Sequence, residues 1–198
     1  AVQEKGCGAL NNLAYNSDEH QAAIAAAGGI AAVVRAMGAH AGSAAVQEKG
    51  CGALNNLAYN SDARRAAIAA AGGIAAVVRA MGAHVGSAAV QASGCAALSN
   101  LAGGSDEHKA AIAAAGGIAA VVRALGAHAG SAAVQQYGCT ALWSIANTTS
   151  KDNAVAIQQA GGVKAIANAT KAFPSDAEVR RTADGAMKVI KPKLGRFR

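Results

Sequence analysis

Apolar residues recur along the chain at three- and four-residue spacing, in short runs that serine and glycine separate. In one such run Val46, Leu54 and Leu57 share one face of a helix, because about 3.6 residues complete a helical turn. Ser43 precedes the run and suits the N-cap position, where a hydroxyl accepts a hydrogen bond from the first turn. The pattern therefore predicts a helix over residues 44–59.

Two shorter helices are predicted between copies of this long helix. Ser17 suits the N-cap of the first, and the acidic residues after it lie where the helix dipole favours negative charge. This helix should run to about Ala27 and end at Gly28-Gly29, because glycine readily adopts the left-handed conformation that ends helices. The second is expected over residues 30–37, before the sequence "GAHAG".

The whole pattern repeats along the chain. One valine marks the register, with spacings of 44, 44, 44 and 45 residues, at Val2, Val46, Val90, Val134 and Val179. Residues 1–44 and 45–88 agree at 40 of 44 positions. A fixed period of this size is typical of repeat proteins, in which each unit buries its apolar face by stacking on the next.

Three helices in each period, short, then medium, then long, resemble the armadillo repeat. The resemblance rests on the "VQE…AL.NLA" pattern of the third helix and on the "AAGGI" junction at 26–30, 70–74 and 114–118, with "QAGGV" at 159–163. It implies an all-α fold, a right-handed α-solenoid of three-helix armadillo repeats whose third helices line a concave surface. HEAT-like repeats share the range of periods but rarely the glycine pair, and they are the alternative.

We expect residues 1–198 to form a single armadillo-repeat domain. Its units are a partial one at about 1–16, full ones at 17–60, 61–104 and 105–148, and a last one at 149–198 with a C-terminal cap. In that last unit Ser175 and Glu178 are expected to form a capping box. The first third helix has no first and second helix before it in this sequence. We therefore expect end-to-end self-association through its uncovered face, or fraying of residues 1–15.

Composition adds that the layers must be thin. Hydrophobic residues make up 53 % of the chain but aromatic residues only 3 %, and much of the apolar content is alanine. Small side chains allow helix axes to approach closely. Glycine inside a helix costs about 1 kcal/mol relative to alanine. The repeated "GCG" of the third helix therefore predicts a close approach of adjacent third helices.

One row of polar residues lies on the side of the third helix opposite its apolar face. In peptide-binding armadillo proteins of the importin-alpha type, this side carries a tryptophan and, four residues later, an asparagine that binds the peptide backbone. The asparagine row is present as Asn12, Asn56 and Asn100, with Ser144 in the fourth copy, whereas glycine, alanine or threonine replaces the tryptophan. The alternative role of the asparagines is to bond to neighbouring helices and hold the stack together.

Further candidates follow from the same surface. An amide offers both a donor and an acceptor, so a row of amides suits an extended backbone of any sequence. Without tryptophan walls, binding should be weak or rely on other aromatic residues, with acidic residues near one end and basic residues near the other selecting charge. The candidate peptide-binding residues of the concave face are Asn12, Asn56, Asn100, Glu4, Glu48, Tyr15, Tyr59, Trp143, Arg181 and Lys188.

The cysteines are expected to be free thiols. They recur every 44 residues, at Cys7, Cys51, Cys95 and Cys139. Neighbouring helices in a stack lie about 10 Å apart, which exceeds the Cα separation of about 7 Å that a disulfide tolerates. Reduced thiols indicate an intracellular protein, cytoplasmic or nuclear. No membrane association is expected, because no apolar run reaches the roughly 20 residues of a membrane span.

Two other rows are expected to be structural. The same spacing argument rules out a metal ion shared by the histidine row, which should instead cap the helices before it, at His40, His84 and His128. The arginine row is expected to cover the solvated outer face, at Arg35, Arg79 and Arg123. No metal site is therefore predicted.

Charge is concentrated at the C-terminal end. Residues 164–198 carry a net charge of +6, whereas residues 1–163 carry +1. The tail "KVIKPKLGRFR" suits a solvated end cap or contact with an acidic partner. Nucleic-acid binding there is disfavoured, because Phe197 is the one aromatic residue of the tail that can stack on a base.

The sequence predicts a non-catalytic scaffold that binds a protein or an extended peptide segment. No nucleophile–histidine–acid set, carboxylate pair or phosphate loop stands apart from the repeats, so neither an enzyme nor a cofactor is expected. The near-identical units raise an alternative, a structural or engineered repeat array with no evolved ligand. A second alternative is contact with an acidic partner or nucleic acid through the basic end.

Overall fold

The computed structural model describes residues 2–194, and every regular element in that range is an α-helix. The chain begins with α1 (Val2–Leu13) and then repeats one order of three helices. The first helices are α2 (Asp18–Ala26), α5 (Asp62–Ala70), α8 (Asp106–Ala114) and α11 (Asp152–Gln159). The second helices are α3 (Gly29–Ala39), α6 (Gly73–Ala83), α9 (Gly117–Ala127) and α12 (Gly162–Ala172). The third helices are α4 (Ala44–Ala58), α7 (Ala88–Ala102), α10 (Ala132–Ala146) and α13 (Ala177–Leu194).

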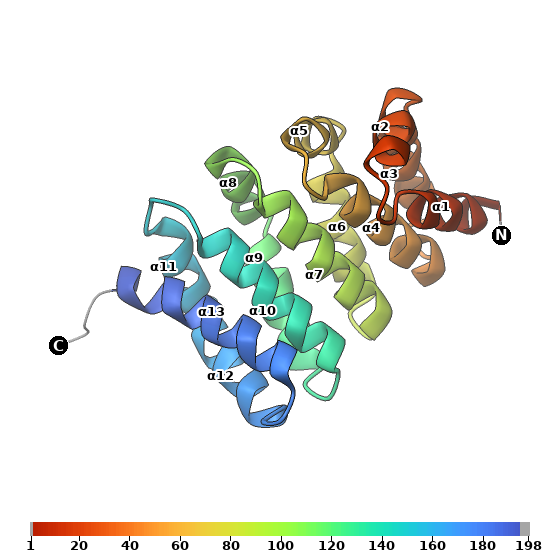
Figure 1. Ribbon diagram of the computed structural model, residues 1–198. Coiled ribbons are helices and arrows are strands. Elements are labelled where there is room, and N and C mark those ends of the chain that lie inside the picture. Colours follow the sequence, from red (N-terminus) through yellow and green to blue (C-terminus); the bar gives the residue numbers. More distant parts are fainter. Residues whose placement is uncertain (1, 195–198) are drawn as a thin grey trace.

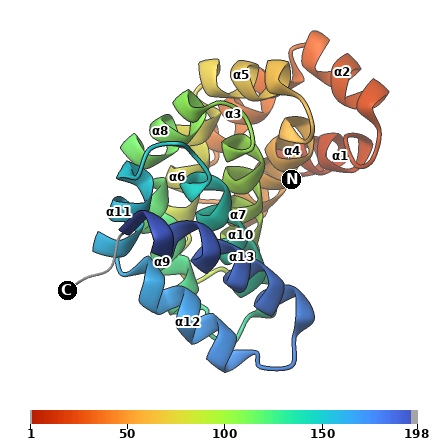
Figure 2. The ribbon, with the colours of Figure 1, turned by 60° about the vertical axis from the view of Figure 1, so that its left-hand side comes forward.

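The triplets are stacked in chain order, and helices α1 and α13 lie at opposite ends of the stack (Figure 1). The third helices lie side by side on one face, in the order α4, α7, α10 and α13, and α1 continues this row at the N-terminal end (Figures 1 and 2). Each third helix packs against the next, and the second helices pack behind them. Buried residues from all triplets form one continuous core.

Local signals set the helix boundaries as predicted. The Ser17 hydroxyl accepts a hydrogen bond from the His20 N–H at 3.2 Å, and the Ser43 hydroxyl accepts one from the Val46 N–H at 3.3 Å. Gly28 adopts the left-handed conformation, with φ of 78°, between α2 and α3. The predicted N-caps and the predicted break at the glycine pair are confirmed, and α2 and α3 meet there at a bend of 72°.

The predicted capping box of the last helix is wrong. Helix α13 begins at Ala177, so Asp176 rather than Ser175 occupies the N-cap position. Oδ1 of Asp176 accepts hydrogen bonds from the N–H groups of Glu178 and Val179, both at 3.0 Å. Aspartate is as strong an N-cap as serine. Because Asp176 directly precedes the first residue of α13, its carboxylate can reach both N–H groups.

The prediction for the "GCG" glycines is half right. A Cβ added at Gly50 would lie 2.5 Å from Cγ of Met37, which belongs to the second helix α3 and not to an adjacent third helix. A Cβ added at Gly52 would lie 2.9 Å from Oδ1 of Asn11 on α1, the adjacent third helix. The absence of a side chain at Gly50 therefore allows the second helix of the same triplet to pack closely, and its absence at Gly52 allows the neighbouring third helix to do so.

The predicted position of the histidines is confirmed, because His40, His84 and His128 are the C-cap residues of α3, α6 and α9 and cap them through their backbone N–H groups. The imidazole rings make a different contact from the one expected. Nε2 of His84 lies 2.7 Å from the carbonyl oxygen of Ala41, in the loop of the preceding triplet, and His128 repeats this contact one triplet later. His84 and His128 therefore join successive loops through their rings. The end of α3 is held by Gln47, whose Nε2 donates to the carbonyl oxygens of Met37 and His40 at 2.9 Å each.

The cysteine and arginine rows lie as predicted. All four cysteines are buried free thiols, and burial raises the pKa of Cys51 and of Cys139 to about 12. The arginines of the predicted outer row are exposed, at Arg35, Arg79 and Arg123. Within residues 2–194 no single helix has the length and apolar character to cross a bilayer, although three bent helix pairs pass that test by length and composition.

Candidate functional site

A groove with a volume of about 380 Å³ opens on the face that the third helices form. Its walls come from the segment after α1, from α2 and from α4, α7, α10 and α13 with the residue that follows α4. Most of its side chains carry amides, hydroxyls or phenols, and no acidic side chain is among them. They are Tyr15, Asn16, Gln21, Asn55, Asn56, Tyr59, Ala96, Ser99, Asn100, Gln136, Tyr137, Thr140 and Arg181.

The structure brings half of the predicted site residues together. The groove is lined by Tyr15, Asn56, Tyr59, Asn100 and Arg181. The other half lies outside its walls, namely Glu4, Asn12, Glu48, Trp143 and Lys188. Glu48 instead forms an ion pair with Lys49 at 2.7 Å, so part of its charge is neutralised by its neighbour in the sequence.

Two tyrosines stand at the ends of third helices. Tyr59 follows the last residue of α4 and is extended, with φ of −62° and ψ of 128°. The next residue, Asn60, has φ of 52°, a left-handed conformation that asparagine tolerates better than most residues. The chain thus leaves the helix sharply, and the side chains of Tyr59 and Tyr15 remain 59 % and 67 % exposed.

Sequence reasoning missed a third tyrosine of the groove. Tyr137 lies on α10, is 40 % exposed and lines the groove beside Gln136. Its position in the repeat is lysine or serine in the other copies, at Lys5, Lys49 and Ser93. That change to an aromatic residue was the available signal. The helical projection placed the row one residue earlier and did not include it.

The asparagines connect successive third helices. Nδ2 of Asn56 donates to the carbonyl oxygen and to Oδ1 of Asn11, both at 2.9 Å. Nδ2 of Asn100 donates in the same way to Asn55, at 3.0 and 2.9 Å. In the fourth copy Ser144 replaces the asparagine, and a contact between successive third helices is still made, because the hydroxyls of Ser144 and Ser99 form a hydrogen bond at 3.1 Å.

These contacts occupy the amide donors of Asn56 and Asn100 but leave the side-chain acceptor of one of them free. Oδ1 of Asn56 accepts a hydrogen bond from Nδ2 of Asn55 at 3.1 Å. Oδ1 of Asn100 accepts none from residues 2–194, and the exposed Asn12 forms no side-chain hydrogen bond with that part of the chain. The free polar capacity therefore lies at Asn12 and at the acceptor side of Asn100.

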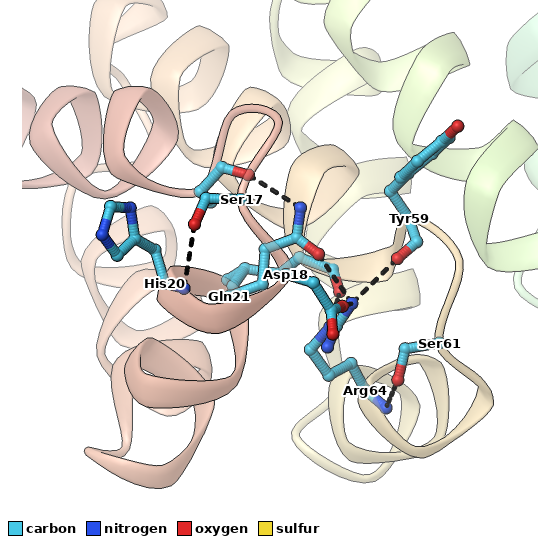
Figure 3. A network of polar contacts seen from close by, with 9 residues as sticks. Ser17, Asp18, His20, Gln21, Tyr59, Ser61 and Arg64 are labelled. Carbon is cyan, nitrogen blue, oxygen red and sulfur yellow. Dashed lines mark hydrogen bonds and ion pairs between the residues drawn. The ribbon is translucent and has the colours of Figure 1, made fainter.

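A buried arginine fixes the position of one groove tyrosine (Figure 3). The guanidinium of Arg64, on α5, is 8 % exposed at the residue level and donates from Nη2 to the Tyr59 carbonyl at 3.0 Å and from Nε to the Leu57 carbonyl at 2.8 Å. The same Nη2 donates to Oε1 of Gln21 at 2.6 Å and pairs with Oδ1 of Asp18 at 2.8 Å. Both acceptors belong to α2, so Arg64 ties the end of α4 to the preceding triplet.

The C-terminal end of the groove is built by α13. Arg181 forms an ion pair with Glu178 at 2.6 Å, and this hydrogen bond raises the pKa of Arg181. Trp143 does not face the groove but packs against α13, where a Cβ added at Gly185 would lie 2.8 Å from its ring. Trp143 therefore seats α13 on α10, and Gly185 provides the space.

One lysine of the basic end has a structural role. Nζ of Lys193 donates to the carbonyl oxygen of Ala146 at 2.8 Å and to that of Thr148, so it caps the C-terminal end of α10. The tail residue Phe197 lies outside the described residues. Within 2–194, no cluster of histidine, cysteine, aspartate or glutamate could hold a metal ion.

Comparison with known proteins shows likeness in structure. The sequence matches no protein-family model and no curated protein. The crystal structure of an engineered protein is 33 % identical, with a TM-score of 0.82 over 96 % of this chain, which spans 44 % of that longer protein. Computationally designed armadillo repeat proteins for modular peptide recognition are 21 % identical, with a TM-score of 0.78 over 91 % of this chain and 72 % of theirs. A designed armadillo repeat protein solved with the peptide (KR)4 is 17 % identical, with a TM-score of 0.57 over 93 % and 91 % of the two chains.

A stack of three-helix layers with one continuous core and a groove along its third helices defines an α-solenoid. The chain has the armadillo-repeat fold, in its right-handed form, as the designed armadillo proteins do. The fold expected from the glycine-pair junction and the third-helix pattern is confirmed.

Proposed function

We propose that the chain is a non-catalytic scaffold that binds an extended peptide segment of a partner protein in the groove of its third helices. The observation that carries this proposal is the gathering of three exposed tyrosines around one groove. Six large hydrophobic side chains are exposed in residues 2–194, and three of them are Tyr15, Tyr59 and Tyr137. Tyrosine combines a large apolar area with a hydroxyl and little side-chain entropy, which suits it to anchor a ligand.

Polar contacts to the peptide backbone come from the amides. Within the groove the free acceptor of Asn100 is available without breaking the contacts between helices, and Asn56 contributes by joining α4 to α1. The amide of Asn12 is available to a peptide that extends beyond the groove walls. Gln136 adds an amide from α10. Glu4 and Glu48 would favour basic peptide residues beyond the N-terminal end, and Lys188 would favour acidic residues beyond the other end.

The positive charge in the groove disfavours a purely basic peptide. Arg181 is the charged side chain of its lining. A designed neighbour with this fold was solved in complex with the peptide (KR)4, which supports peptide binding as a function of the fold. In this chain we expect peptides with an acidic residue near Arg181 to bind more tightly than (KR)4.

Selection from a displayed library of random octapeptides tests the proposal. Selected peptides should bind with one peptide per chain, and Tyr59→Ala and Tyr137→Ala should each weaken binding by roughly tenfold, as expected for anchor residues. Val85→Ala is the matched control, because Val85 is an exposed apolar residue outside the groove. Titration of (KR)4 under the same conditions measures the expected charge preference.

Failure of the selection would favour a different function. Peptides that bind the tyrosine variants as tightly as the unchanged chain would place the site elsewhere. No selected peptide at all would support the second candidate, a structural array, which the asparagine contacts between helices also fit.

Buried free thiols support placement in a reducing intracellular compartment.

A further inference from the structure

A second hollow lies between the second helices α3 and α6, behind the row of third helices. Its volume is about 330 Å³, its walls are mostly apolar, and it shares no residue with the lining of the groove. Ligand sites in proteins begin at roughly 300 Å³, so this space suits a small group rather than a long segment. We call it the rear hollow, and its walls include Met37, Gln47, Ala76, Arg79, Ala80 and Ala83.

One wall of the rear hollow carries an amide oxygen without a partner. Gln47 is 2 % exposed, and its Nε2 donates to the carbonyl oxygens of Met37 and His40. Oε1 of Gln47 accepts no hydrogen bond from residues 2–194. It is not sealed in the core, because the one fully enclosed side-chain nitrogen or oxygen without a partner in that range belongs to His108. A nearly buried acceptor without a donor is costly, so this oxygen favours a ligand that brings a donor into the hollow.

A positive charge without a partner stands at the same hollow. Arg79 is exposed and forms no hydrogen bond or ion pair within residues 2–194, whereas Arg64, Arg65 and Arg181 each pair with an acidic side chain. Helices α3 and α6 contain no acidic residue, and none lines the hollow. Arg79 is therefore free to bind an anion, and a guanidinium suits a carboxylate because it can donate two parallel hydrogen bonds to it.

The same combination recurs between α9 and α12. A hollow of about 240 Å³ there is lined by Gln135 and Lys164 among others. Gln135 is 2 % exposed, its Nε2 donates to two carbonyl oxygens at the end of α9, and its Oε1 accepts no hydrogen bond within residues 2–194. The cation comes from a different helix position, because Lys164 is the third residue of α12 and Arg79 is the seventh of α6. A buried amide beside a cation therefore accompanies both hollows.

We propose that the rear hollow binds the C-terminal residue of a partner polypeptide. The backbone N–H of that residue donates to Oε1 of Gln47, and its terminal carboxylate pairs with Arg79. Its apolar side chain occupies the space between Met37 and the alanines of α6. An internal peptide residue has no carboxylate beside its backbone N–H, and a fatty acid has no N–H for Gln47. One C-terminal residue supplies the donor, the anion and the apolar group together.

Short peptides with and without the terminal charge test the proposal. An acetylated tripeptide that ends in leucine, added to the isotope-labelled chain, should shift the side-chain amide signals of Gln47 and the Nε–H signal of Arg79 in nuclear magnetic resonance spectra. The same peptide with a C-terminal amide should bind roughly tenfold more weakly, because it loses the charge-assisted hydrogen bonds. A tripeptide that ends in glycine should lose a similar factor, because it leaves the apolar space empty.

Two variants locate the binding. Arg79→Gln should weaken the acid peptide roughly tenfold and leave the affinity of the amide peptide unchanged. Arg123→Gln is the matched control, because Arg123 is the seventh residue of α9 and lines neither hollow. Ala41→Val should weaken both peptides by filling part of the rear hollow. The repeat accommodates this change, because Val85 stands at the equivalent position of the next triplet.

Three results would overturn the proposal. The first is equal affinity for the acid and amide peptides, or no shift at Gln47 with the acid peptide at its highest soluble concentration. The second is the same shifts with sodium acetate at equal concentration, which would mean an adventitious ion only. The third is loss of the Gln47 shift in Tyr59→Ala, which would assign the peptide to the groove. An unchanged Gln47 shift in that variant supports the rear hollow and keeps this test separate from that of the groove.

Discussion

At the scale of single residues, the repeat shows that identical side chains acquire different roles from their surroundings. Gln3 and Gln47 lie in identical stretches, yet Gln3 is exposed and Gln47 is 2 % exposed and bonded to two carbonyls. The sequence did not reveal this glutamine row, because its partners lie seven and ten residues earlier, across a turn. A hydrogen bond of this kind depends on how two helices pack.

Removal of the Gln47 amide should destabilise the fold. Gln47→Ala leaves the carbonyls of Met37 and His40 without their donor in a mostly buried setting, and should lower the free energy of unfolding by about 1–3 kcal/mol. Gln3→Ala is the matched control and should change it by less than about 0.5 kcal/mol. Urea titration followed by circular dichroism measures both. Equal losses in the two variants would contradict the proposed capping role.

A site residue could be predicted from the sequence only where its position on its own helix determines whether its side chain is exposed. The helical projection correctly placed Tyr15 and Tyr59 on the groove. It placed Trp143 on the same surface, but that side chain packs against Gly185 of α13 instead. The interhelical bonds of Asn56 and Asn100 matched the alternative that sequence reasoning left open. Choosing between the two roles requires the distance between neighbouring third helices.

At the scale of helices, the glycine pair determines how each triplet bends. The first and second helices meet at 72°, 68° and 67° in the first three triplets. The first glycine supplies a positive φ, which was expected from the sequence. The second has a separate reason, because a Cβ added at Gly73 would lie 2.9 Å from the backbone oxygen of Ile68. Local rules place the break, but this contact appears only in three dimensions.

Substitution of the second glycine should therefore be severe. Gly73→Ala forces its Cβ against a backbone oxygen that cannot rotate away, and we expect a loss of about 2 kcal/mol or more. Gly82→Ala lies in the same helix, where an added Cβ meets nothing within 4 Å, and should stabilise by up to about 1 kcal/mol through helix propensity. Thermal unfolding of the two variants should move in opposite directions. A stabilised Gly73→Ala variant would contradict the steric argument.

At the scale of the whole molecule, stacking was the most predictable property and the ligand surface the least. A period of 44 residues with one apolar face per helix requires neighbours to cover each other, so the continuous core follows from the pattern. Curvature and groove volume instead depend on small side chains between third helices, such as Gly52 against Asn11. The ion pair of Arg64 with Asp18 joins two successive triplets, and it arises where two copies differ in sequence.

Because of its buried thiols, the stack should lose stability as the pH rises above 9. Burial raises the pKa of Cys51 and Cys139 from 9.0 to about 12, and burial together with its neighbouring thiols raises that of Cys95 further. Below pH 9 the thiols are protonated in both states, and their stabilising contribution is complete. As pH rises from 9 towards 12, the unfolded chain loses these protons first, so the free energy of unfolding falls by at most about 1.4 kcal/mol per pH unit and thiol.

Replacement of the three thiols isolates this effect. A variant with Cys51→Ala, Cys95→Ala and Cys139→Ala should be less stable at pH 7, because it loses buried volume, but its stability should fall less steeply between pH 9 and 11. Comparing slopes rather than absolute values separates the pH dependence of the thiols from the loss of packing, which does not depend on pH. Urea unfolding at several pH values provides the slopes. Parallel slopes would show that the thiols ionise as easily in the folded stack as in the unfolded chain, which their burial in a continuous core does not allow.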